Sequence, residues 1–323
     1  MFNSFAKRTT KVWRLFLKIK YLCELILEMS KKPHKAGFVS IIGKPNVGKS
    51  TLMNQMVGER LSIITSKAQT TRHRIFGIIS GEDFQIVYSD TPGIIAPQYE
   101  LHRSMMRFVN SSLEDADVIL LVTDIYEKHE ENEILSRVEK TDVPIIMLLN
   151  KIDQAKGTQV VDKIAYWKEL VNVKEIIPIS ALEGLGISDV FDKIIEHLPE
   201  HPPYFPKDQL TDKSERFFAA EIIREKIFQN YKKEVPYSTE VVVEAFKEEE
   251  DIIRIRAEIY VERKSQKGII IGKEGKALKK VGIEARETME AFFGKQIFLE
   301  TYVKVAEEWR KKEIHLNRFG YKQ

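Results

Sequence analysis

Residues 41–52 read Ile41-Ile42-Gly43-Lys44-Pro45-Asn46-Val47-Gly48-Lys49-Ser50-Thr51-Leu52, which leaves an apolar strand, turns on two glycines and enters a helix. Gly43 and Gly48 let backbone N–H groups turn inward, because glycine has no Cβ to clash. Lys49 offers its charge to the outer phosphates of a nucleotide, and Ser50 offers a hydroxyl to Mg²⁺. The pattern predicts a phosphate cradle over residues 43–51, flanked by a strand over 37–42 and a helix over 49–57.

Composition sets broad limits on the protein. A chain of 323 residues predicts two domains. The formal net charge of +3 is nearly balanced, so any basic surface must be local. The single cysteine, Cys23, excludes an internal disulfide framework and fits a reducing compartment such as the cytoplasm.

Residues 1–36 are rich in Lys and Arg and contain only two acidic residues, Glu24 and Glu28. Charges interrupt the apolar positions too often for a membrane-spanning helix. One interpretation is an amphipathic helix that lies on a membrane surface. The interpretation we favour is that Met29 is the true start, and mass spectrometry of the native N-terminus distinguishes the two.

After the cradle helix comes a polar stretch, residues 66–74, which suits a mobile segment. A threonine in such a segment can add its hydroxyl to Mg²⁺ only when the third phosphate is present. Taken alone, this stretch would be an ordinary surface loop.

The expected strand over residues 84–89 ends at Asp90-Thr91-Pro92-Gly93. Asp90 can hold the Mg²⁺ shell, and the Gly93 N–H can meet the third phosphate. Two continuous apolar runs, residues 118–122 and 144–149, are typical of parallel strands covered on both faces. Residues 90–93 are therefore predicted to form a second part of the same nucleotide site.

The run at 144–149 leads into Asn150-Lys151-Ile152-Asp153. The Asp153 carboxylate can accept both the N1–H and the 2-amino group of guanine, whereas adenine lacks these donors. A further strand over residues 176–179 precedes Ser180 and Ala181, whose backbone can approach the guanine carbonyl. The ordered motifs predict a translation-factor-class GTPase, an α/β domain with a mostly parallel sheet and its ligand at the strands' carboxyl ends.

Ile94 stands where Ras-type switches carry a glutamine that orients the attacking water. An aliphatic side chain cannot do so, and slow hydrolysis is expected unless another group helps. Asn46 is one candidate, because GTPases with Asn at this cradle position resemble a group in which bound K⁺ supplies the positive charge of an arginine finger. The alternative, weighed equally, is that Asn46 only caps the loop.

A proline-rich stretch over residues 198–206 predicts a stiff, extended linker and a domain boundary. Beyond it, residues 215–231 have helical spacing, and residues 241–246 and 252–261 are expected strands. In the last of these, apolar residues alternate with Arg254, Arg256, Glu258 and Tyr260, which predicts one buried and one charged face.

The sequence Gly272-Lys273-Glu274-Gly275 lies between an apolar Ile-Ile-Ile and an expected helix ending at Phe293. This context matches the KH module, whose glycine loop clamps a single-stranded nucleic-acid backbone. Nearby lysines make a local basic patch: Lys264, Lys267, Lys273, Lys276, Lys279 and Lys280. Glu274 opposes phosphate and departs from the glycine often found there. The alternative is a surface helix with solvated lysines.

Together, Gln69-Thr70-Thr71-Arg72-His73, Asp90-Thr91-Pro92-Gly93-Ile94, the Pro-Pro-Tyr-Phe-Pro linker and the KH module resemble the Era family of bacterial GTPases from about Gly37 to the end. The resemblance implies a GTPase domain over 37–198, a linker over 199–214 and a type II, α+β KH domain over 215–323. Such a domain has a helix, two strands, a helix pair and a last strand, here expected over 296–305. It also implies GTP hydrolysis to GDP and phosphate, with Ser50, Thr71 and Asp90 at Mg²⁺ and with Lys49, Thr71 and Gly93 in catalysis.

The same resemblance implies binding of the 3′ end of 16S ribosomal RNA, a role in small-subunit maturation, and a cytoplasmic monomer with a peripheral inner-membrane fraction. Two alternatives remain open. One is an RNA-binding adaptor whose nucleotide domain has lost turnover, which intact Lys49, Ser50, Asp90 and Asp153 disfavour. The other is a membrane-tethered scaffold organised by residues 1–36.

Overall fold

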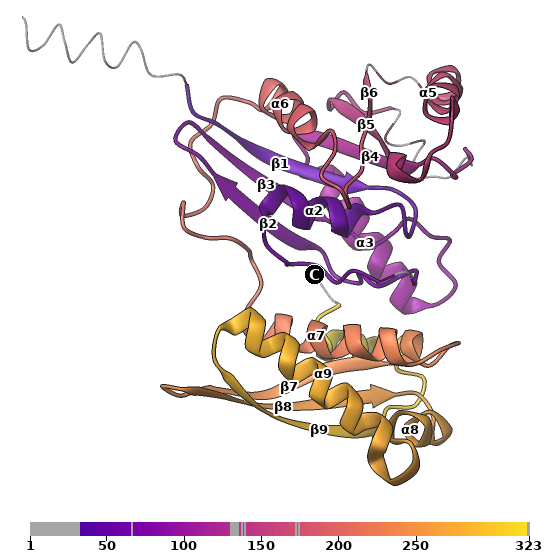
Figure 1. The fold of residues 1–323 in the computed structure, drawn as a ribbon, viewed down its shortest axis with the longest axis vertical. Helices are drawn as coiled ribbons and strands as arrows, with labels where there is room; N and C mark the ends of the chain where they lie inside the picture. Colours follow the sequence, from indigo (N-terminus) through magenta and orange to yellow (C-terminus); the bar gives the residue numbers. More distant parts are fainter. Residues whose placement is uncertain are drawn as a thin grey trace, which may run out of the picture.

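A computed structural model describes residues 33–321 apart from residues 66, 130–135, 137, 139, 172 and 174. The predictions for Cys23 and for nearly all of the basic N-terminal segment lie outside the described residues. The described chain forms two parts, each built on its own β-sheet and stacked one above the other (Figure 1). No helix within these described ranges combines the length and apolar character needed to cross a bilayer.

The first sheet has six strands in the order β2-β3-β1-β4-β5-β6. Neighbouring strands pair in parallel except β2, which runs antiparallel to β3. The mostly parallel α/β domain predicted from the sequence is confirmed. The strands are β1 (Lys35–Ile42), β2 (Ile75–Ser80), β3 (Phe84–Asp90), β4 (Val118–Asp124), β5 (Ile145–Asn150) and β6 (Glu175–Pro178).

Helices cover both faces of this sheet, which is why its central strands are apolar at nearly every position. Ile41 packs on one face with α2 (Lys49–Val57) and α6 (Ile187–His197). The next residue, Ile42, packs on the other face with α3 (Glu100–Glu114), where α5 (Gln159–Leu170) also packs. Because β1, β3, β4 and β5 run in parallel, their carboxyl ends lie at one edge, where the predicted motifs follow.

The sequence did not predict strand β2, and this strand has contacts with the linker between the two domains. The Ile78 amide donates to the Leu210 carbonyl at 2.8 Å, and Gly77 forms a bridge with Thr211. Residues 210–212 therefore lie along the outer edge of β2, so the linker is not only an extended spacer. This contact covers an edge that would otherwise expose unpaired backbone groups.

The second part follows the predicted order of a helix, two strands, a helix pair and a last strand. Its sheet has the order β7-β8-β9, with β7 antiparallel and β9 parallel to β8. Apolar residues of all three helices pack against the sheet. The elements are α7 (Glu215–Asn230), β7 (Glu240–Glu248), β8 (Ile252–Val261), α8 (Lys264–Ile271), α9 (Lys276–Phe293) and β9 (Gln296–Val305).

The prediction of a fully charged outer face on β8 is wrong for its second half. Arg254 and Arg256 are exposed, but Glu258 and Tyr260 are buried. The chain beyond β9 covers Tyr260, because the Phe319 ring packs 5.0 Å from the Tyr260 ring, measured between centroids, and Glu258 pairs with Lys304 of β9. Tertiary contacts from a segment far along the chain thus override the alternation within the strand.

This closing segment also joins the two parts of the molecule. It contains η4 (Trp309–Lys311) and α10 (Glu313–Arg318). Trp309 is fully buried, and its indole N–H donates to the Ser238 carbonyl at 2.9 Å. Trp309 and Tyr321 share a hydrophobic core with residues of α3, so the C-terminal segment fills the space between the two sheets.

Candidate functional site: a nucleotide cavity and a glycine loop

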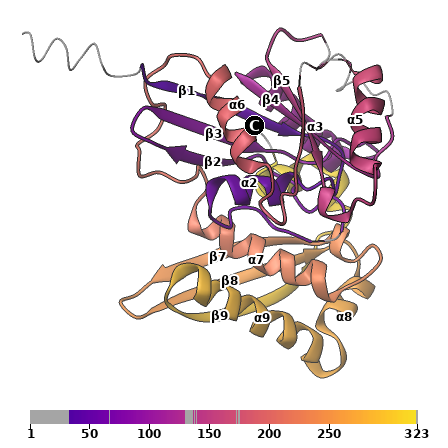
Figure 2. The same cartoon turned by 45° about the horizontal axis from the view of Figure 1, so that its top comes forward.

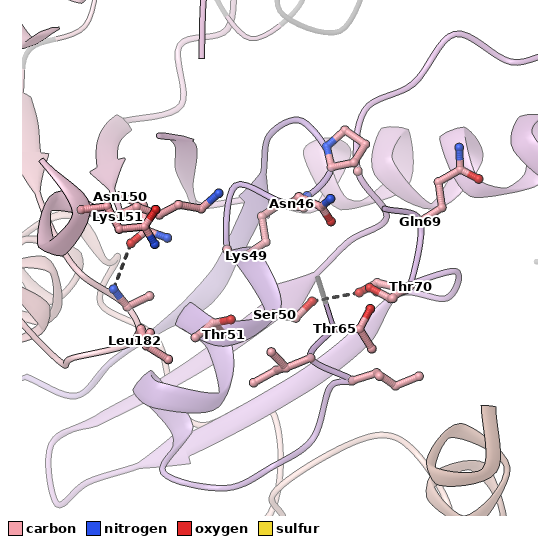
Figure 3. A pocket seen from close by; sticks show the side chains of 18 of the residues that line it. Asn46, Lys49, Ser50, Thr51, Thr65, Gln69, Thr70, Asn150, Lys151 and Leu182 are labelled. Atoms are coloured by element: carbon pink, nitrogen blue, oxygen red, sulfur yellow. Dashed lines mark hydrogen bonds between the residues drawn. The ribbon is translucent and has the colours of Figure 1, made fainter. Parts of the chain in front are cut away.

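A cavity of about 540 Å³ opens at the carboxyl edge of the first sheet (Figure 3). The loop between β1 and α2 forms one wall. Gly43 has φ +152°, and a Cβ there would lie 2.2 Å from the Val122 carbonyl oxygen. Gly48 has φ +100°, and a Cβ there would lie 2.2 Å from Asn150 Nδ2. Both glycines are therefore required by the backbone and by its close neighbours.

Lys49 is buried at the start of α2, with its ammonium directed back into the loop. Nζ donates to the carbonyl oxygens of Gly43 at 3.1 Å and Lys44 at 2.9 Å. Burial lowers the pKa of Lys49 to about 8, although the charges of Asp90 and Glu127 act in the opposite direction. A buried ammonium is stabilised by an anion at hydrogen-bond distance, which a nucleotide phosphate supplies.

The three predicted metal-binding oxygens meet at one point. Ser50 Oγ donates to Asp90 Oδ2 at 2.7 Å and lies 2.8 Å from Thr71 Oγ1. Asp90 is fully buried, and its Oδ1 has no hydrogen-bond partner among the residues that the structure describes. Burial raises the pKa of Asp90, while the Ser50 hydroxyl and the Lys49 charge lower it. A carboxylate with an unpaired buried oxygen beside two hydroxyls fits the hard cation Mg²⁺.

The segment after Asp90 lies against the cradle. A Cβ on Gly93 would be 2.7 Å from the backbone nitrogen of Pro45, so only glycine permits this approach. Thr91 is buried and donates through Oγ1 to the Ile41 carbonyl at 2.8 Å, which fixes the segment, including the buried Pro92. Ile94 packs into the core beside α3. Its side chain cannot take the place of a water-orienting glutamine, in agreement with the sequence prediction.

Asn150 connects the cradle to the predicted base-binding loops. Its Nδ2 donates to the Val47 carbonyl at 2.7 Å, and its Oδ1 accepts from the Ala181 amide at 2.9 Å. Asp153 Oδ1 accepts from Ser180 Oγ at 2.6 Å, so a side chain of the Ser-Ala pair orients the carboxylate. The prediction gave that pair a backbone role only. The structure adds the hydroxyl contact.

The other predicted nucleotide-binding residues surround these groups. Lys44 Nζ lies 3.6 Å from a Glu127 carboxylate oxygen. Lys151 has φ +64° and donates to Asp124 Oδ2 at 2.6 Å. Residues Pro45, Asn46 and Thr51 line the cavity, with Asn46 in the left-handed region at φ +65°.

Several lining residues were missed by the sequence reasoning: Thr65, Gln69, Gln154 and Leu182. Asp124, which holds Lys151, was also missed. It ends β4, and the carboxyl ends of parallel strands share an edge, so its position after an apolar run was a usable signal. Thr65, Gln69 and Leu182 lie in irregular segments and Gln154 ends the short 3-10 helix η1 (Ile152–Gln154), so no local pattern marks them.

Residues 67–74 have no regular secondary structure, as expected, but the alternative of an ordinary surface loop is wrong for part of the segment. Thr71, Arg72 and Arg74 are all buried. Arg74 Nε donates to Ser89 Oγ at 2.7 Å, and Arg74 also forms an ion pair with Asp115 at 2.6 Å. Packing against the rest of the protein fixes a segment that has no helical or strand pattern of its own.

The predicted RNA-binding residues lie at the connection between α8 and α9. Gly272 has φ +71°, and a Cβ there would lie 2.6 Å from the Ala277 Cβ. Gly275 has φ +74° and precedes α9. Lys273 and Lys279 are exposed, and Lys276 and Lys280 pair with Glu274 at 2.8 Å and Glu284 at 3.7 Å. The glycine loop is therefore present, and glutamates neutralise part of its basic patch.

A phosphate cradle, three converging oxygen ligands and an Asp153-bearing loop on one parallel sheet define a P-loop GTPase, here followed by a KH domain. Comparison with family models agrees with this class: residues 38–151 match a family described as "50S ribosome-binding GTPase", and residues 234–310 match "KH domain".

The relatives narrow the class to one family. GTPase Era of Syntrophus aciditrophicus is 48% identical over 293 residues, covering 90% of this chain and 96% of the relative. The chloroplastic GTPase ERA1 of Zea mays is 45% identical over 89% of this chain and 71% of the relative. The chain therefore belongs to the Era family, and it is a GTPase that uses GTP, GDP and Mg²⁺.

Two solved Era structures have the same fold. One, in complex with MgGDPNP and nucleotides 1506–1542 of 16S ribosomal RNA, matches with a TM-score of 0.85 and 39% identity, over 90% of this chain and 100% of that chain. The other, an Aquifex aeolicus Era variant bound to GDP·AlF4⁻, has a TM-score of 0.83 and 39% identity over the same shares.

Proposed function

We propose that this GTPase binds the 3′ end of small-subunit ribosomal RNA through its KH domain and assists maturation of that subunit. The observation that carries the proposal is the Gly272–Gly275 loop at the start of α9, in a chain that matches an Era structure containing nucleotides 1506–1542 of 16S ribosomal RNA. In this proposal the nucleotide bound in the first domain controls engagement of RNA by the second.

The chemistry of the loop favours an RNA backbone as its ligand. Neither Gly272 nor Gly275 carries a Cβ, so a phosphodiester can approach the main chain of the loop closely. Lys273 and Lys279 are exposed and can contact phosphates. Because such contacts release counterions, affinity should fall steeply as salt concentration rises.

A filter-binding assay with the 1506–1542 fragment tests the proposal. Lys273→Asp combined with Glu274→Asp should abolish retention of the RNA without changing the melting temperature. Lys168→Asp, at an exposed lysine of α5, is the matched control and should bind as the wild type does. Unchanged affinity of the double variant would show that the loop is not the RNA site. RNA-stimulated phosphate release would also exclude the adaptor alternative.

As a second proposal, we propose that K⁺ activates GTP hydrolysis and that Asn46 helps to bind the ion. The support is that Asn46 lines the nucleotide cavity (Figure 3), whereas the Ile94 side chain packs in the core beside α3. Turnover should then be faster in K⁺ than in Na⁺ at equal ionic strength. Equal rates would instead favour the interpretation of Asn46 as a residue that only shapes the cradle loop.

We also propose that the protein is a cytoplasmic monomer with a peripheral fraction at the inner membrane. The support is the resemblance to the Era family together with the basic composition of residues 1–36. Fractionation of the full chain beside a chain starting at Met29 tests this. Loss of the membrane fraction in the shorter chain would assign it to the basic segment, and its absence from both chains would refute the proposal.

A further inference from the structure

The residues on both sides of Thr71 are anchored to the second domain. The Thr70 carbonyl accepts a hydrogen bond from the Arg224 guanidinium, which comes from α7. On the other side, Arg72 Nη1 donates to the Thr239 carbonyl at 2.8 Å and to Glu240 Oε2 at 2.9 Å. The hydroxyl between these anchors is the one that lies 2.8 Å from Ser50 Oγ at the predicted metal site.

Both arginines are held in place by buried partners. Arg224 is 1% exposed, and its Nε donates to Glu221 Oε1 at 2.7 Å. Arg72 is 2% exposed, and its partner Glu240 also accepts from the Tyr321 hydroxyl at 2.6 Å. Buried charges are costly without such partners, so neither guanidinium can leave its position unless the interface opens.

Two residues that precede Thr71 in the chain also contact α7 of the second domain. Lys67 donates to the Phe228 and Tyr231 carbonyls at the end of α7. Arg60 pairs with Glu225. Figures 1 and 2 show from two directions that α7 lies on the side of the second domain that faces the first.

We infer that the second domain positions the metal-binding threonine, with Arg224 and Arg72 as the positioning residues. When the second domain is docked, the hydroxyl of Thr71 stays beside Ser50 and Asp90, so less conformational freedom is lost when Mg²⁺ and a nucleoside triphosphate bind. The coupling is reciprocal, because a ligand that requires the docked threonine also stabilises docking by the same free energy. The inference deepens the proposed function by naming the link between nucleotide and RNA-binding domain.

The test uses the full chain and a fluorescent, non-hydrolysable GTP analogue titrated with Mg²⁺. Arg224→Met with Glu221→Gln removes the donor to Thr70 without leaving a buried unpaired charge. The Mg²⁺ concentration for half-maximal analogue binding should rise about tenfold, as expected for one lost hydrogen bond from a charged donor. GDP binding should change by less than about twofold, because a switch threonine contributes only when the third phosphate is present.

Arg60→Ala with Glu225→Gln is the matched control, since it breaks an ion pair across the same interface without touching residues 70–72. It should leave the Mg²⁺ titration unchanged. Arg72→Met with Glu240→Gln provides an independent second variant that should repeat the effect. An unchanged titration in both test variants, or an equal rise in the control or with GDP, would overturn the inference.

A second readout examines the reverse direction of the coupling. In the wild type, Mg²⁺ with the GTP analogue should slow amide hydrogen exchange over residues 224–240 relative to Mg²⁺ with GDP. Equal exchange in the two states would contradict the inference. Neither measurement uses RNA. A negative result here would therefore count against the positioning of Thr71 and not against the proposed RNA-binding site.

Discussion

Asn150 provides the sharpest test of how the nucleotide cavity is held together. Its side-chain amide donates to the Val47 carbonyl at 2.7 Å and accepts from the Ala181 amide at 2.9 Å, and all three residues are at most 2% exposed. In Asn150→Ala both backbone groups lose their partner. Because each of the two unsatisfied buried groups costs about 1–3 kcal/mol, the free energy of unfolding should fall by about 2–6 kcal/mol.

The same change should also weaken nucleotide binding, because the cradle and the Ser-Ala loop are no longer tied to each other. We expect GDP affinity to fall by at least about tenfold, which corresponds to about 1.4 kcal/mol. Urea denaturation measures the stability, and isothermal titration calorimetry measures the affinity. Asn150→Asp keeps an acceptor for Ala181 but cannot donate to Val47, so it should lose affinity as well.

Gln85 supplies the matched control for Asn150. It is fully buried, and its side-chain amide forms hydrogen bonds with Ser80, Tyr204 and Phe205 at distances of 2.7–3.1 Å. It lies about 16 Å from Asp90 along β3, at about 3.3 Å per residue. Gln85→Ala should therefore lower stability but leave GDP affinity unchanged. Wild-type affinity in Asn150→Ala, or an equal loss of affinity in Gln85→Ala, would refute the reasoning.

Further predictions concern the base, the third phosphate and pH. Asp153→Asn should shift preference from guanosine toward xanthosine nucleotides, because an amide N–H replaces an acceptor; full retention of GDP preference in calorimetry would contradict the assignment. Gly93→Ala should weaken binding of a GTP analogue more than binding of GDP, since its Cβ would lie 2.7 Å from the Pro45 nitrogen; equal losses would argue otherwise. Burial is the main cause that lowers the pKa of His73 to about 3, and the Arg224 charge is the next. Below pH 6.5 His73 therefore binds a proton in the unfolded chain but stays neutral in the folded chain. Between pH 7 and pH 5 this should lower the free energy of unfolding by about 2 kcal/mol, and His73→Phe should remove that part of the pH dependence measured by urea denaturation.

Much of the nucleotide site could be predicted because its chemistry is local in sequence. The two glycines, Lys49 and Ser50 act through a few consecutive residues, and their spacing alone requires the turn that the structure contains. Asp90 and Asn150 each end an apolar strand, and parallel strands bring their carboxyl ends to one edge. The nucleotide site was therefore predictable from motif order, and so was the order of elements in the second domain.

The tertiary structure alone established what the segment around Thr71 and the outer face of β8 contact. Nothing near Arg72 in the sequence marks it as buried, since its partners lie at residues 236–240. The pattern of β8 predicted exposed Glu258 and Tyr260, but Glu258 is buried beside Lys304 of β9 and the Phe319 ring packs on Tyr260. The physical reason is the same in both cases. The periodicity of a sequence shows which face of its own helix or strand a residue lies on, whereas burial of a charged side chain depends on partners that the whole fold brings together.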